Sequence, residues 1–387
     1  MTPGMLLLSA LVIAQDQNAS LLRIGPFSFQ PTLLVQNIGR DPNVFNSSTN
    51  PQSDFTMTIS PKMNVVLRVR RSKTIFAQTT DYVYFKRFAS ERGTNESYAV
   101  REEVDLGVLQ PFASATTSSS KSRINAEVDQ RARHENTEYT VGSSVALFTR
   151  THASFKARRI STTFDGNETF RGESLASAFD GFIEGFDTGV GIALTPLTSF
   201  DVVFTKELQR FDLASDRNSN TFRVMPTFTF SPLGLLNGTA SFGYRKFTPK
   251  DPAVPAFKGF VAQVTASVTV KDRHRLSTTV LRDLTYSYDH ASVYYIQNSF
   301  GGTWAFQIGH GVESQLGATR NLMHYHQTAS TGPADDTYTS YDFALGYRIL
   351  PRLRAAINGA FSKRQSGVSA DRGYDSNRVY GTVTWGG

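Results

Sequence analysis

The sequence predicts an all-β protein, a transmembrane antiparallel up-and-down β-barrel of about 16–18 strands. Apolar and polar residues alternate with a period of two through most of the 387 residues. The alternating segments are longer than the five or six residues of an ordinary soluble strand. Short turns and long polar loops follow one another along the chain, as they do in barrels that cross an outer membrane.

The clearest alternation lies between Phe55 and Val69, where the odd positions are apolar and nearly all even positions are polar. Because successive side chains of a strand point to opposite faces, one face of this strand is predicted to be apolar. The pattern recurs in residues 222–230, 260–270, 294–308, 341–349 and 353–361, and it is weakest in 74–86, 111–123 and 151–162. A soluble β-sandwich or propeller explains alternation, but not such long strands in this order of loops and turns.

Connections of two lengths are predicted. Tight turns are expected at 195–198, 231–234, 271–274, 309–311 and 350–352, where Pro, Gly or short polar runs favour a chain reversal. Long polar loops are expected at 37–52, 118–137, 164–178, 248–256, 327–336 and 365–375. Since short turns face the periplasm in outer-membrane barrels, both chain termini are predicted to be periplasmic.

Composition narrows the class further. The chain has no cysteine, which excludes disulfides, thiolate metal sites and cysteine nucleophiles. Its 29 Phe and 15 Tyr suit a lipid-facing band with aromatic girdles. The net charge of +7 is not gathered on a recognisable nucleic-acid-binding module, so no nucleic-acid partner is expected.

The N-terminus predicts a secretory signal. Residues 5–14 form an apolar run that is too short to span a bilayer as a helix. Val12 and Ala14 occupy positions −3 and −1 of a small-residue cleavage site. We therefore expect a signal peptide over 1–14, a short N-terminal segment over 15–24 and the barrel over 25–387. The alternative is a buried N-terminal helix or strand.

The two faces of the strands predict two sets of residues. Polar residues on one face are expected to line the lumen: Arg68, Arg101, Glu103, Asp105, Asp187, Gln263, Asp283, Gln297, Asp342, Arg348 and Arg354. Apolar residues on the other face are expected to contact lipid: Phe55, Leu67, Phe222, Phe228, Phe230, Val264, Val268, Trp304, Phe306, Phe343, Leu345 and Ile357. The lumen charges suit either a selective pore or an ion-pair network that braces or fills the barrel.

Two positions depart from this simple pattern. Arg282 lies on an otherwise apolar face, where a mid-membrane arginine would cost about 2–4 kcal/mol, so a β-bulge or a rim position is expected. The last strand carries Tyr380, Val383 and Trp385, which we expect to form the signal for the barrel-insertion machinery, although Gly386 and Gly387 follow it.

No catalytic or metal-binding pattern is present. His324 and His326 share a strand face, but two histidines alone do not make a zinc site, so neither metal nor cofactor is expected. Residues 165–167 and the pair Asp335–Asp336 lack the spacing of a calcium loop and are expected to be turns. No nucleophile elbow is found, which argues against an enzyme.

Several segments resemble the putative β-barrel porin 2 family over essentially the whole mature chain. The resemblance is carried by residues 29–33 (FQPTL), 41–45 (DPNVF), 53–55 (SDF) with 60–61 (SP), 247–255 (FTPKDPAVP) and 282–288 (RDLTYSY). It implies an outer-membrane barrel, of a family often associated with exopolysaccharide export or with unassigned envelope functions.

These observations lead to one main functional expectation and two rivals. The main expectation is a porin-like channel for small hydrophilic solutes, or an accessory channel for exopolysaccharide export. The first rival is a structural or docking barrel with a filled lumen whose external loops bind a partner, and the second is a barrel enzyme. The expected partners are outer-membrane lipids and lipopolysaccharide, the insertion machinery and components of polysaccharide export.

Overall fold

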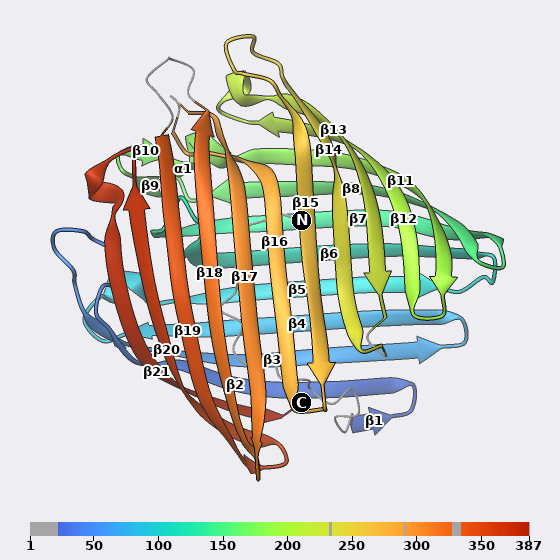
Figure 1. The fold of residues 1–387 in the computed structure, drawn as a ribbon, viewed down its shortest axis with the longest axis horizontal. Helices are drawn as coiled ribbons and strands as arrows, with labels where there is room; N and C mark the ends of the chain where they lie inside the picture. Colours follow the sequence, from blue (N-terminus) through green and yellow to red (C-terminus); the bar gives the residue numbers. More distant parts are fainter. Residues whose placement is uncertain (1–21, 232–233, 290–291, 327–333, 387) are drawn as a thin grey trace.

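The computed structural model describes residues 22–231, 234–289, 292–326 and 334–386 (Figure 1). The predicted signal peptide, with its cleavage site, lies outside these residues. Antiparallel strands, most of them 12 residues or longer, make up most of the described chain. They are β1 (Leu22–Ile24), β2 (Phe27–Asp41), β3 (Asp54–Val69), β4 (Ser72–Phe85), β5 (Gly93–Val104), β6 (Leu109–Arg123), β7 (Arg131–Phe148), β8 (Thr151–Phe164), β11 (Gly181–Thr195), β12 (Thr198–Phe211), β13 (Ser219–Phe230), β14 (Leu236–Pro249), β15 (Phe257–Val270), β16 (His274–Tyr286), β17 (Tyr294–Gly309), β18 (Val312–His326), β19 (Ala334–Leu350), β20 (Leu353–Ser366) and β21 (Tyr374–Gly386).

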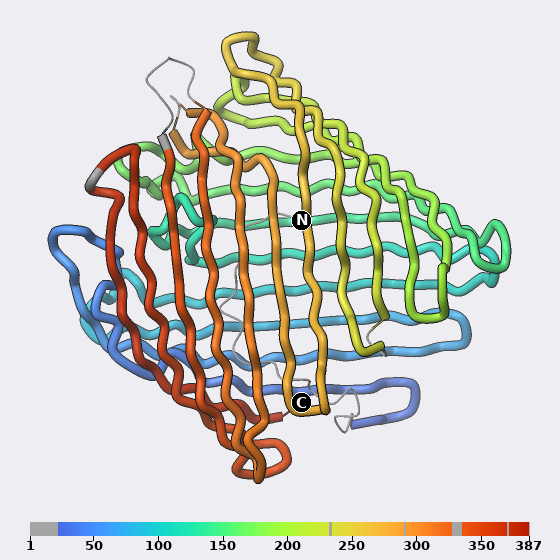
Figure 2. Tube along the Cα trace, viewed as in Figure 1, coloured from blue at the N-terminus to red at the C-terminus, as the bar shows by residue number. Residues whose placement is uncertain are grey.

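The sheet closes into a barrel. Each strand from β2 onward pairs with its neighbour in the chain, β8 pairs with β11, and β21 returns to pair with β2. Figure 2 shows the blue N-terminal strands beside the red C-terminal ones at this closure. Of the 19 strands in the sheet, β1 only extends β2 as a small hairpin, so 18 strands form the ring. The predicted antiparallel barrel is confirmed.

Segments with blurred alternation are nevertheless complete strands. Residues 74–86, 111–123 and 151–162 fall almost entirely in β4, β6 and β8. The predicted loop at 118–137 is mostly strand, because β6 runs to Arg123 and β7 starts at Arg131. Alternation fails there because the outward face is charged: Lys121 and Arg131 both form ion pairs with Glu91. A charged outward face hides the two-residue period from the sequence.

The two faces of the barrel differ in kind. Along β11, the side chains of Phe186, Val190 and Ile192 point outward and are exposed. Gly185 and Gly191 occupy inward positions of the same strand and are buried. The same division holds on β19, where Tyr341 to Ile349 expose every second side chain on the outside. An apolar outside and a polar inside are the arrangement that a barrel needs in a lipid bilayer.

The two ends of the barrel also differ. At the short-turn end the predicted turns at 195–198, 271–274, 309–311 and 350–352 are present, whereas the one predicted at 231–234 lies partly outside the described residues. The β15–β16 turn holds Lys271 and Asp272 at φ 52° and 53°. The loops at the other end, which we call the long-loop end, carry the small elements β9 (Thr169–Phe170), β10 (Glu173–Ser174), α1 (Leu175–Phe179), η1 (Ala89–Glu91), η2 (Ser215–Arg217) and η3 (Ala370–Arg372). None of the described helices is long and apolar enough to cross a membrane.

Candidate functional site: the lumen and its long-loop mouth

The lumen is open in its middle and filled towards the long-loop end. Inward-facing Gln263, Thr265 and Thr279 near mid-barrel are exposed to solvent. Gln297 and Asn321 also face inward, nearer the long-loop end, and are buried. Since these side chains all point into the barrel, the exposed ones border an aqueous space and the buried ones are covered by other parts of the chain.

A band of ion pairs crosses one wall of the lumen. Arg158 on β8 binds Asp187 on β11 at 2.7 Å, and its other nitrogen binds Glu207 on β12. Arg223 on β13 lies 3.4 Å from Glu207 and 2.9 Å from Asp283 on β16. Each carboxylate in this band therefore contacts at least one arginine, which is how charges persist in a partly desolvated wall.

Asp283 on β16 connects this band of ion pairs to strands β14 and β16. Arg245 on β14 donates to its Oδ1 atom at 2.6 Å and to the carbonyl of Leu284 at 3.0 Å. Arg223 contacts the other carboxylate oxygen, so two arginines hold one aspartate. The last residues of β16, which no longer pair with β15 beyond Arg282, are thereby drawn against the inner face of β13 and β14.

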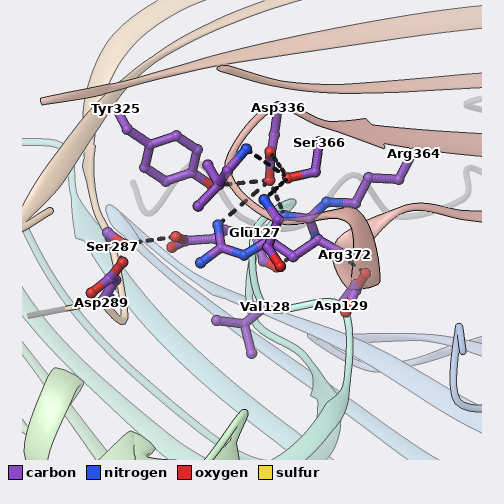
Figure 3. A network of polar contacts seen from close by, with 12 residues as sticks. Glu127, Val128, Asp129, Ser287, Asp289, Tyr325, Asp336, Arg364, Ser366 and Arg372 are labelled. Carbon is purple, nitrogen blue, oxygen red and sulfur yellow. Dashed lines mark hydrogen bonds and ion pairs between the residues drawn. The ribbon is translucent and has the colours of Figure 1, made fainter. Parts of the chain in front are cut away.

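Contacts between opposite loops span the mouth at the long-loop end (Figure 3). Ser287 donates to Oε1 of Glu127 at 2.6 Å, and the backbone N–H of Tyr288 donates to Oε2 at 3.1 Å. Glu127 lies in the β6–β7 loop and Ser287 in the β16–β17 loop, eight strands apart one way around the ring and ten the other. The two loops therefore meet across nearly the full width of the barrel. We call this contact of residues 127–128 with 287–288 the mouth bridge.

Burial controls the charge of Glu127. The side chain is fully buried, and this burial raises its pKa from 4.5 to about 7. The hydrogen bond from Ser287 and the charge of Arg372 lower the pKa in part. Glu127 is therefore poised to change its protonation state near neutral pH, at the point where the two loops join.

A second set of contacts ties the β6–β7 loop to the last strands. Arg364 on β20 donates to the carbonyl of Glu127 at 2.7 Å, to Asp129 at 3.1 Å and to Asp336 at 2.6 Å. Arg372 in η3 donates to the hydroxyl of Tyr288 at 2.5 Å. These arginines link the mouth bridge to the wall at β19 and β20, so loops from three sides of the barrel share one network (Figure 3).

Apolar clusters stabilise the folded-in loops. One gathers residues of the β6–β7 and β8–β11 loops and of the adjoining ends of β7 and β8 around Tyr288: Val128, Ala132, Phe164, Phe170, Leu175, Ala176 and Ala178. The other packs the β16–β17 end against β12 and β14: Phe211, Ala214, Phe247, Val254, Leu284, Tyr286, Val293, Tyr294 and Ile296. Arg217 is 1% exposed between them, near the rings of Phe179, Phe211 and Tyr286.

Most of the predicted lumen residues lie on inward positions, but in separate groups. Asp187 and Asp283 belong to the ion-pair band. Arg101 and Glu103 bind each other at 2.7 Å, and Arg354 binds Glu313 on another part of the wall. Gln263, Gln297 and Asp342 face inward, whereas Arg68 and Arg348 lie near the short turns and are exposed. Their role as pore lining stays a prediction.

One predicted lumen residue is misplaced. Asp105 follows the end of β5 and lies in the exposed β5–β6 turn, where its carboxylate accepts from the N–H of Gly107 at 2.8 Å. An aspartate that caps a backbone N–H two residues later favours a turn over a continued strand.

The predicted lipid-facing residues all occupy outward positions. Ile357, Leu345 and Phe222 are among the most exposed, at 59%, 47% and 44%. In the last strand Val383 and Trp385 face outward, but Tyr380 faces inward beside Arg378. The aromatic surface available to an insertion factor on this strand is therefore Trp385 and not Tyr380.

Arg282 lies near the long-loop rim and remains on the outward face. No register shift interrupts β16 beside it, so the expected bulge is absent. Its guanidinium donates to the carbonyl of Phe260 at 3.2 Å and to Asn298 at 2.6 Å. The position four residues before the end of β16 lets the charge lie near the rim.

Asp335 and Asp336 are not a turn. Both belong to β19, where Asp335 lies 2.9 Å from His324, and Asp336 is fully buried against Arg364. His326 instead stacks on Tyr294, with ring centroids 5.0 Å apart. In the described parts of the chain, no group of three or more His, Asp or Glu side chains could hold a metal ion.

Sequence reasoning missed the mouth network. Glu127, Arg364 and Arg372 lie in or beside segments expected to be polar external loops. One signal was available, because Ile124, Ala126 and Val128 alternate with polar residues inside a predicted loop. Such alternation in a loop indicates a face that is packed and not solvated.

Comparisons with known proteins agree with this architecture. The family model described as putative beta-barrel porin 2 matches residues 18–385. The fold is similar to that of OccK2 (OpdF) from Pseudomonas aeruginosa, with a TM-score of 0.54, 10% identity, and coverage of 92% of this chain and 98% of that chain. A BenF-like porin from Pseudomonas fluorescens Pf-5 gives a TM-score of 0.53, 10% identity, and coverage of 92% and 98%. No curated protein is significantly similar in sequence.

Proposed function

The chain belongs to the putative beta-barrel porin 2 family, and we propose from that premise that it is a diffusion channel for small hydrophilic solutes in the Gram-negative outer membrane. The observation that carries this proposal is the contrast between an apolar outer face and a polar, solvent-exposed inner face at mid-barrel. A ring of 18 strands is wide enough to leave an aqueous channel between such walls.

The mouth bridge favours small solutes over polymers. Loops from opposite sides of the ring meet across the long-loop end and are held by Glu127, Ser287 and Tyr288. A polysaccharide chain would need this contact to separate, whereas a small solute needs only a gap beside it. OccK2 has been crystallised with glucuronate, a small carboxylate sugar, and a solute of that size suits the cargo proposed here.

The orientation follows from the loop lengths. We place the short-turn end and both termini in the periplasm, and the long-loop end at the cell surface. Loops that fold into the mouth then restrict entry from outside. On this orientation the buried network of Figure 3 lies on the external side of the lumen.

Liposome swelling tests the proposal. Purified protein is reconstituted into liposomes, and the swelling rate is measured with sugars and sugar acids of increasing size. We expect uptake of monosaccharides and a steep fall for oligosaccharides. Uptake that does not depend on size would contradict a mouth restricted by loops, and no uptake at all by folded protein would contradict a channel.

A second function has a specific observation in its favour. The two apolar clusters and the arginine network fill the long-loop end as a packed interior would. This suits the docking barrel, whose lumen is closed and whose surface loops bind a partner. Folded protein that admits no solute, even after the mouth network is weakened, would support this second function.

A further inference from the structure

We propose that Lys206, Lys246 and Lys258 form a binding site for the phosphate groups of lipid A, the membrane anchor of lipopolysaccharide. The inference rests on the proposed function to the extent that this function places the long-loop end at the cell surface. The three lysines occupy one row on the outward face of β12, β14 and β15, and all three are exposed.

The register of the strands brings the three ammonium groups together. Lys246 is directly opposite Lys258, and Phe222 on β13 is opposite both Lys206 and Lys246. Neighbouring strands lie about 4.8 Å apart, so Lys206 is roughly 10 Å from Lys246 across the ring of Phe222. The site therefore holds a close pair of cations and a third one two strands away.

Like charges directly opposite each other destabilise a strand pair unless an anion lies between them. Within the described part of the chain, none of the three lysines forms an ion pair. The nearest outward carboxylate on β11, that of Glu184, is bound to Arg159 at 2.9 Å. The described residues therefore leave this cluster without a counter-ion.

The position of the lysine cluster along the barrel axis indicates which molecule supplies that counter-ion. Two residues closer to mid-barrel, Tyr244 and Phe260 face each other on the same outward surface, exposed by 44% and 53%. Lys246 is three residues from the end of β14, and Lys258 is the second residue of β15. The ammonium groups thus lie where an apolar, lipid-facing surface ends, at the level of lipid headgroups.

Lipid A fits this position better than a phospholipid or a free ion. It fills the outer leaflet at the proposed external end, and each molecule carries two phosphates on a rigid disaccharide. Lys246 and Lys258 would hold one phosphate, and Lys206 would add charge on the far side of Phe222. Phe222, Tyr244 and Phe260 would pack against the acyl chains below.

Native mass spectrometry of the detergent-solubilised full chain tests the site. Bisphosphorylated lipid A is titrated against the wild type, the double variant Lys246→Gln/Lys258→Gln, and the single variant Lys206→Gln. Lys271→Gln, in the short β15–β16 turn, is the matched control. We expect the double variant to lose roughly tenfold or more in affinity, which is about 1.4 kcal/mol, and the control to lose none. Enzymatically dephosphorylated lipid A should bind the wild type as weakly as intact lipid A binds the double variant.

Three results would overturn the proposal. Equal binding of lipid A by the wild type and the double variant would remove these lysines from the site. Equal binding of phosphatidylglycerol would show a general attraction for anionic lipid. Displacement of lipid A by millimolar inorganic phosphate would show a site for the free ion. Should the double variant not fold, Lys206→Gln alone decides between the first of these results and the expected loss.

Liposome swelling in parallel separates this site from the channel. The double variant should admit monosaccharides at the wild-type rate, because its lysines face away from the lumen. Loss of lipid A binding with unchanged uptake supports the lipid site. Absence of uptake in both proteins would contradict the channel and leave the lipid result standing by itself.

Discussion

Arg158 on β8 hydrogen-bonds to Glu207 on β12, although strand β11 lies between them. The contact is possible because Gly185 of β11 is the residue paired with both. A Cβ atom on Gly185 would lie 3.0 Å from three atoms of the Arg158 side chain. The same device recurs at Gly191, which lies beneath the pair His152–Asp201, and at Gly346, beneath Arg354–Glu313. Inward glycines thus let charges two strands apart meet along the lumen wall.

Replacing Gly185 tests this arrangement. In the variant Gly185→Val the branched side chain displaces Arg158, so Glu207 loses one of its two arginines. We expect the free energy of unfolding to fall by about 1–3 kcal/mol, although valine is otherwise favoured in strands. Urea unfolding followed by tryptophan fluorescence measures the change. Thr188→Val on the outward face of β11 is the control, and equal stability of the two variants would contradict the bridging role.

The assignment of faces predicts opposite effects at adjacent residues. Val264→Arg puts a charge on the outward surface at mid-barrel and should cost about 2–4 kcal/mol of barrel stability in lipid. Thr265→Arg puts the same charge into the exposed lumen, where water solvates it, so stability should hardly change and conductance should fall. Unfolding from liposomes and channel recordings measure the two effects. Similar stability losses in both variants would show that the faces are wrongly assigned.

Weakening the mouth network should widen the channel. In Arg364→Met the β6–β7 loop loses its hydrogen bonds at Glu127 and Asp129, and buried Asp336 loses its shortest arginine contact. We expect larger single-channel conductance and uptake of larger sugars. Lys363→Met changes the adjacent, outward side chain of β20 and should leave both unchanged. A mouth that stays equally narrow in Arg364→Met would mean that these contacts do not limit the path.

The buried carboxyl of Glu127 predicts a dependence on pH. Burial raises its pKa from 4.5 to about 7, so the folded mouth bridge keeps a proton that an opened loop gives up between these values. The bridge is therefore most stable below about pH 4.5 and loses stability as pH rises to 7, by roughly 3 kcal/mol in all. We expect larger conductance at pH 8 than at pH 5.

The variant Glu127→Gln separates this carboxyl from other titrating groups. An amide keeps the acceptor for Ser287 and stays neutral at every pH. Its conductance should remain at the low-pH value of the wild type between pH 5 and 8. A wild-type pH profile in Glu127→Gln would assign the dependence to another residue.

The sequence was sufficient for the barrel because lipid and water impose opposite demands on alternate residues. Phe55 to Val69 shows this directly, since its two faces became the outside and the inside of β3. The same rule placed Trp304 and Ile357 outward. The alternation of apolar and polar residues is weaker where the outward face is charged, as at Lys121 and Arg131 near the rim.

The mouth could not be predicted because its contacts join residues far apart in the chain. Glu127 and Ser287 are 160 residues apart, and no local period links them. Asp336 was the last residue of a predicted loop, yet it lies in β19 and is fully buried by arginines from β20 and η3. The conformation of a loop that folds inward depends on contacts with distant parts of the barrel. Such a loop therefore shows only weak alternation in its own sequence.

Single-channel recording in planar bilayers tests the central claim most directly. We expect the folded wild-type protein to give reproducible conductance steps at neutral pH. We expect the single-channel steps of Arg364→Met to be larger than those of the wild type. Folded protein that inserts but gives no steps, in the wild type and in Arg364→Met alike, would contradict a diffusion channel restricted at its long-loop mouth.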